Sequence, residues 1–166
     1  MAADEVDRLV AAWQRERPDL DVAPMGVLSR VSRLARHLDR ARRSAFAAHG
    51  LEPWEFDVLA ALRRSGPPYE LSPRTLLAQT LVTSGTMTSR VDKLTARGLV
   101  TRRADEHDRR AVRVVLTEQG KSSVDAALES LLAHERSILA NVAPDDQAML
   151  ANLLRALVLP FDDTAE

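Results

Sequence analysis

Apolar residues recur at helical spacing through both ends of the chain. The first run places Val6, Leu9, Val10 and Trp13 on one face, and Pro18 ends it. The same spacing predicts amphipathic helices over four segments: residues 4–17, 25–48, 118–141 and 144–159, the last stopped by Pro160. Their stripes hold more apolar surface than so small a core can cover, so we expect these outer helices to form a dimer.

The centre of the chain holds shorter predicted helices. One of them spans residues 53–64, and its centre, residues 56–62, is apolar on every side around one acid, Asp57. This pattern is typical of a buried helix, in which an ionised acid needs a positive partner. Two further helices are predicted over residues 73–79 and 84–96, the second capped by Thr83 or Ser84.

Two β-prone segments follow, residues 99–103 and 112–116, and they predict a hairpin with a long charged tip. A helix pair followed by a hairpin, with helices on both sides, predicts a mainly α fold of the winged helix-turn-helix type. We therefore divide the chain into an N-terminal helix and first dimerisation helix (1–48), a winged helix-turn-helix region (49–117) and C-terminal dimerisation helices (118–166).

The net charge of −1 conceals a strong partition along the chain. Residues 30–43 sum to +5 and residues 63–113 to +6, whereas residues 118–166 sum to −6. A basic centre predicts a face that binds a polyanion such as nucleic acid. The alternative is that these charges mix on one solvated surface.

Composition excludes several other classes. The 166 residues include no cysteine and four scattered histidines, so we expect no disulfide and no metal site. No catalytic triad or glycine-rich phosphate loop is present, which argues against an enzyme and against a bound cofactor. No apolar run reaches the length of a membrane span, and the N-terminus is acidic, so we expect a cytoplasmic protein.

Small and hydroxyl residues gather at the start of the predicted helix over residues 84–96. They are Ser84, Gly85, Thr86, Thr88 and Ser89. Such side chains let a helix approach base edges and phosphates closely in the major groove. The alternative is that they only cap the helix. At the hairpin tip, Arg109 and Arg110 suit insertion into a minor groove, although charged tips are often simply solvated.

The stretch SGTMTSRVDKLTARGLVTRRADEHDRRAVRVVLT, residues 84–117, followed by Glu118-Gln119-Gly120, resembles the MarR family of transcription regulators. Asp108 and Arg110 match the family's Asp-x-Arg in the wing, and the resemblance extends over about residues 30–158. It implies a homodimeric winged-helix repressor that binds a pseudo-palindromic operator of double-stranded DNA. It also implies release by a small acidic ligand.

A narrower resemblance, to the urate-responsive branch of this family, rests on an extra N-terminal helix and four residues. Trp13, Asp57, Arg90 and Arg102 stand at matching places and imply a pocket for a urate- or xanthine-like or an aconitate- or citrate-like anion. The alternatives for these residues are that Trp13 only packs and that Asp57 and Arg90 form a structural salt bridge. For the protein as a whole, the alternatives are another phenolic or acidic effector, or a winged helix that serves as a protein-interaction adaptor.

Overall fold

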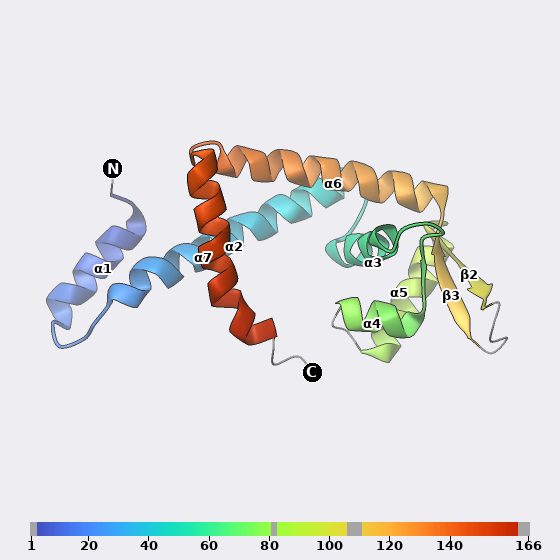
Figure 1. Cartoon of the computed structure of the whole chain (residues 1–166), viewed down its shortest axis with the longest axis horizontal. Helices are drawn as coiled ribbons and strands as arrows, with labels where there is room; N and C mark the ends of the chain where they lie inside the picture. Colours follow the sequence, from blue (N-terminus) through green and yellow to red (C-terminus); the bar gives the residue numbers. More distant parts are fainter. Residues whose placement is uncertain (1–2, 81–82, 106–110, 163–166) are drawn as a thin grey trace.

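A computed structural model describes residues 3–80, 83–105 and 111–162. The chain is mainly helical, with one small antiparallel sheet (Figure 1). In chain order the elements are α1 (Glu5–Glu16), α2 (Ala23–Ala47), α3 (Pro53–Arg64), β1 (Glu70–Leu71), α4 (Pro73–Thr80), α5 (Ser84–Ala96), β2 (Val100–Ala104), β3 (Val112–Leu116), α6 (Glu118–Leu139) and α7 (Pro144–Asp162). This order confirms the winged helix-turn-helix prediction, with α4 and α5 as the helix pair and β2 and β3 as the wing.

The predicted capping signals set several of these bounds. Thr83 caps α5 by accepting a hydrogen bond from the amide of Thr86 at 3.4 Å. Thr117 caps α6 in the same way, with the amide of Gly120 at 3.0 Å. Each cap satisfies a backbone donor that a helix start leaves unpaired. Thr83, rather than Ser84, is therefore the cap of α5.

The predicted hairpin of β2 and β3 is confirmed, but the sequence analysis missed a third strand and ended α7 too early. The sheet has three strands in the order β1-β3-β2, because Glu70 and Leu71 pair with Val115 and Val114. A two-residue strand is too short to show alternation in the sequence. Helix α7 also continues through Pro160, which lies in its last turn. A proline there loses the hydrogen bond of its own nitrogen and crowds the carbonyl four residues earlier, but only two further residues of the described helix follow it.

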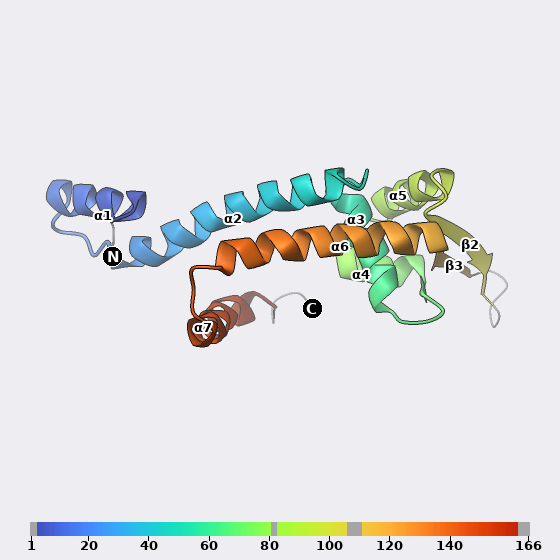
Figure 2. The same cartoon turned by 90° about the horizontal axis from the view of Figure 1, so that it is seen from above.

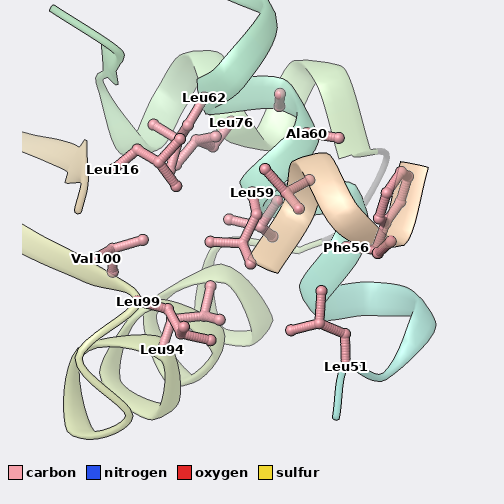
Figure 3. Packing of buried hydrophobic residues seen from close by; sticks show 14 of the residues in the cluster. Leu51, Phe56, Leu59, Ala60, Leu62, Leu76, Leu94, Leu99, Val100 and Leu116 are labelled. Carbon is pink, nitrogen blue, oxygen red and sulfur yellow. The ribbon is translucent and has the colours of Figure 1, made fainter. Parts of the chain in front are cut away.

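The hydrophobic core centres on α3 (Figure 3), and the long helices α2 and α6 add Phe46 and Val124 to it. As predicted, α3 is buried on most sides, and Val58, Leu59 and Leu62 are fully covered. Leu76 of α4, Leu94 of α5 and Val114 of β3 close around it. This packing fixes α5 and the wing on a common base.

Long α2 and α6 run side by side away from this base (Figures 1 and 2). Helix α1 lies against the far end of α2, and α7 turns back from the end of α6 and lies apart from both long helices (Figures 1 and 2). We call α1, α2, α6 and α7 together the arm. Helix α7 contains no buried residue in its described range, and Met149, Leu153 and Phe161 are all more than half exposed. No described helix is both long and apolar enough to cross a membrane.

Candidate functional site

Helix α5 presents two contrasting faces. Met87, Val91 and Leu94 are buried against the core, as the helical pattern predicts. The other side carries five exposed residues, which are the five small ones singled out from the sequence: Ser84, Gly85, Thr86, Thr88 and Ser89. We call these five the small-residue face. It surrounds the N-terminus of the helix, where the backbone dipole favours an anion.

Gly85 has no role inside the chain that requires a glycine. A Cβ atom added to it would meet nothing within 4 Å, and its backbone is in an ordinary conformation. In an exposed first turn, glycine costs helix stability relative to alanine. Packing among the described residues therefore gives no reason for a glycine at this position.

The hydroxyl groups of the small-residue face are only partly used by the protein. Thr86 Oγ1 shares a hydrogen bond with Thr83 Oγ1 at 2.9 Å, and Thr88 Oγ1 donates to the carbonyl of Ser84 at 3.2 Å. Within the described part of the chain, the hydroxyls of Ser84 and Ser89 form no hydrogen bond. These two groups remain able to donate to or accept from base edges or phosphates.

The wing is held by ion pairs along its strands. Arg103 Nη2 lies 2.7 Å from Glu70 Oε2 of β1, and Arg113 Nε lies 2.5 Å from Asp105 Oδ2. The hydrogen bond to Asp105 raises the pKa of Arg113 above its ordinary value, so this residue stays cationic. The predicted groove-reading residues, Arg109 and Arg110, lie outside the described residues, as does Asp108.

A third ion pair joins the wing to α5. Arg102 Nη2 on β2 lies 2.7 Å from Asp92 Oδ1 on α5. Both side chains are about half exposed, so we assign the pair at most about 1 kcal/mol. Its effect is geometric, because it ties the first strand of the wing to the outer side of α5.

A buried acid that the sequence analysis missed holds the other end of α5. Glu55, only 3% exposed, accepts a hydrogen bond from Arg97 Nη1 at 2.5 Å and one from the Glu52 amide at 2.9 Å. Arg97, the residue that ends α5, also donates to the carbonyl of Gly50 at 2.8 Å. The signal in the sequence was the spacing of Glu52 and Glu55 around Pro53, which is that of a capping box.

Asp57 is not the buried acid of α3, contrary to our expectation. Its side chain is about half exposed, and its partner is Arg42 of α2, with Nη2 and Oδ1 3.3 Å apart. The salt bridge considered between Asp57 and Arg90 is absent. Asp57 faces out of α3 because the opposite side of that helix packs into the core.

Arg90 instead lies over an aromatic ring. Its guanidinium carbon is 5.4 Å from the ring centroid of Trp54, in the first turn of α3. Trp54 and Asp57 are three positions apart on α3 and so share one face of it. Arg90 and Asp57 therefore both belong to the side of α3 that carries Trp54, but each has a different partner there.

The other two predicted ligand residues lie elsewhere in the chain. Trp13 is 46% exposed on α1, at the end of the arm opposite α3, α5 and β2 (Figures 1 and 2). Arg102 is bound to Asp92, which is two positions from Arg90 on α5 and hence about 200° around the helix. The expected convergence of all four residues is thus wrong for a single chain.

Comparison with known proteins agrees with this architecture. The MarR family profile matches residues 49–111. The HTH-type transcriptional regulator PecS of Dickeya dadantii (strain 3937) is 39% identical over 150 residues, which cover 90% of each chain. A MarR family protein from Bacillus stearothermophilus has a similar solved structure, with a TM-score of 0.73 at 23% identity over 86% of this chain and 99% of that one. BpsR from Bordetella bronchiseptica, whose DNA binding 6-hydroxynicotinic acid regulates, has a TM-score of 0.58 at 26% identity over 76% and 91% of the two chains.

Proposed function

The chain belongs to the MarR family of DNA-binding transcriptional regulators and is not an enzyme, and from this premise we propose the details of its action. It represses its target genes as a homodimer on a pseudo-palindromic operator, and a small anionic metabolite releases it. The small-residue face of α5 is the observation that carries this proposal. Packing does not require a glycine at position 85, and the hydroxyl groups of Ser84 and Ser89 form no hydrogen bond within the described part of the chain.

In the proposed complex, the N-terminus of α5 enters a major groove. Ser84 and Ser89 meet base edges or phosphates, and Gly85 allows the backbone to come close. The wing lies beside the helix, and Arg109 and Arg110 at its tip reach a minor groove. The ion pair between Arg102 and Asp92 supports this arrangement because it fixes the position of the wing relative to α5.

The dimer places residues 1–48 and 118–166 of two copies together. Apolar side chains more than a third exposed on the arm support this assignment; they include Leu9, Val27, Leu28, Val31, Leu34, Leu128, Leu132, Ile138, Met149, Leu150, Leu153, Leu157, Val158 and Phe161. Exposed apolar surface of this extent is typical of a protein interface. A two-fold dimer would present two α5 helices to two half-sites.

The ligand site proposed here centres on Arg90, on the face of α3 that carries Asp57. Arg90 and Arg42 supply positive charge there, and in the described part of the chain Arg90 forms no ion pair with a carboxylate. A planar or carboxylate anion therefore finds a donor that the protein does not neutralise. The regulation of BpsR by 6-hydroxynicotinic acid favours a ligand of this class. Trp13 joins such a site only from a second copy, and Arg102 acts on it through α5.

Binding to a DNA fragment from the region upstream of the protein's own gene tests the proposal. We expect salt-sensitive binding that urate, xanthine, citrate, trans-aconitate or 6-hydroxynicotinate reverses. Arg90→Ala should lose most of this response and should still bind the operator, although less tightly than the wild type. Absence of salt-sensitive DNA binding would favour the adaptor alternative, and an operator complex that none of these anions releases would remove the ligand assignment.

A further inference from the structure

Trp54 links the DNA-reading helix to the body of the protein through two positive charges. The indole lies in the first turn of α3, half-buried against the hydrophobic core. Arg90 lies over its ring, and Lys93 Nζ is 6.0 Å from the same ring centroid. These two residues are three positions apart on α5, so one aromatic ring holds two successive cations of that helix.

The Trp54 ring is the partner that the structure shows for the charged groups of Arg90 and Lys93. In the described residues, neither Arg90 nor Lys93 forms an ion pair with a carboxylate. One turn further along, Arg97 is held differently, by the buried Glu55. Attraction of a cation to the face of a tryptophan is weaker than a buried ion pair and depends on the charge of the cation. Among the contacts between α3 and α5, the attraction of Arg90 and Lys93 to the Trp54 ring is thus the one that a bound anion can weaken.

We propose that Trp54 is a positioning residue, which holds α5 in its DNA-binding position through Arg90 and Lys93 and couples anion binding at Arg90 to release of DNA. An anion that pairs with Arg90 offsets its charge and so weakens its attraction to the indole. Helix α5 then loses part of its hold on α3. The coupling half of this inference rests on the proposed function, whereas the positioning half does not.

A double-mutant cycle in operator affinity tests the positioning half without any ligand. Trp54→Leu should weaken operator binding several-fold in the full-length protein. In a background of Arg90→Met and Lys93→Met, the same substitution should have little further effect. Trp54→Phe keeps a ring face and should restore most of the affinity. Equal losses in both backgrounds, or a phenylalanine variant no better than the leucine variant, would show that Trp54 only packs.

The coupling half is tested by the ratio of operator dissociation constants with and without a saturating anion. Any anion that releases the wild type should give a smaller ratio in Trp54→Leu, even after its lower starting affinity is taken into account. A packing defect would lower the affinity and leave the ratio unchanged, which would overturn the coupling. If no anion from the panel releases the wild type, the proposed ligand response fails, while the affinity cycle still decides the role of Trp54.

Fluorescence gives an independent readout, because the chain has only two tryptophans, Trp13 and Trp54. The part of the emission that is missing in a Trp54→Phe protein reports Trp54, and Trp13 stays in place in this comparison. We expect the releasing anion to shift this emission in the absence of DNA, and Arg90→Met to abolish the shift. An emission shift that persists in Arg90→Met would place the anion elsewhere and contradict the inference.

Discussion

Gly120 in the first turn of α6 lies directly against the backbone of Leu99, so closely that a Cβ atom on it would be 2.1 Å from the Leu99 carbonyl oxygen. Thr117 strengthens this joint, since its amide donates to the same carbonyl at 3.2 Å and its hydroxyl donates to the carbonyl of Gly98 at 2.8 Å. The start of the long arm helix and the root of the wing are therefore one rigid junction.

Gly120→Ala should destabilise the whole fold, because β2 and α6 must separate to admit the methyl group. We expect a loss of about 2 kcal/mol or more, in the range of severe overpacking. Thermal or urea unfolding of the purified protein measures it. An alanine variant as stable as the wild type would mean that the junction can relax.

Gly85→Ala makes the same chemical change at a position with open space around it, so it is a matched control. The free energy of unfolding of this variant should stay the same or rise by up to about 1 kcal/mol, since alanine is the better helix former. Operator affinity should nevertheless fall, because the methyl group enters the space proposed for DNA. An unchanged affinity in a titration would remove Gly85 from the interface.

Assembly is tested on α7. Leu153→Glu together with Leu157→Glu places two charges in the proposed dimer core and should give monomer or aggregate without operator binding. Ala148→Glu together with Asn152→Glu adds the same charge at the same spacing, on a side of the helix away from Leu153 and Leu157, and should remain dimeric. Sedimentation at micromolar concentration distinguishes them, and a monomeric wild type would contradict the proposed dimer.

Mixed dimers show whether Trp13 serves the Arg90 of its own chain. A dimer of one Trp13→Ala chain and one Arg90→Ala chain should keep one intact ligand site if each site is built across the two-fold. A dimer of one wild-type and one doubly substituted chain should then keep none. Calorimetric titration of dimers purified through two different tags counts the sites. The reverse result would place Trp13 and Arg90 of one chain in the same site.

Low pH should loosen α1 from α2. Hydrogen bonds from Arg30, and then from the Asp7 amide, lower the pKa of Asp4 to about 2. A lowered carboxyl pKa means that this contact stabilises fully above the ordinary value near 3.8 and is lost as the pH falls towards 2. Trp13 emission in a Trp54→Phe protein follows the change between pH 5 and 2. With Arg30→Gln the loss should occur at higher pH, and identical profiles would exclude the ion pair.

Local signals in the sequence were sufficient for most elements of the fold. Periodicity and capping residues gave α3, α5 and β3 with their observed bounds, because these signals act within one or two turns. Strand β1 was missed because its two residues owe their conformation to β3 rather than to each other.

The candidate site depended on tertiary partners, which local patterns do not specify. Asp57 and Glu55 lie in the same apolar helix, and only the packing of α3 decides that Glu55 is the buried acid. Arg90 contacts Trp54 and Arg102 pairs with Asp92 because of how neighbouring elements pack, which the local sequence does not show. The small-residue face was predictable because it lies on a single helix.

The ion pair between Arg102 and Asp92 has a consequence for redesign of DNA specificity. A recognition helix transplanted from another protein without an acid at position 92 leaves Arg102 without its partner and changes the angle of the wing. A wing transplanted alone has the converse effect on α5. Helix α5 and the wing should therefore be exchanged together. A chimera that keeps both Arg102 and Asp92 should retain DNA affinity better than a chimera in which only one of the two elements is exchanged.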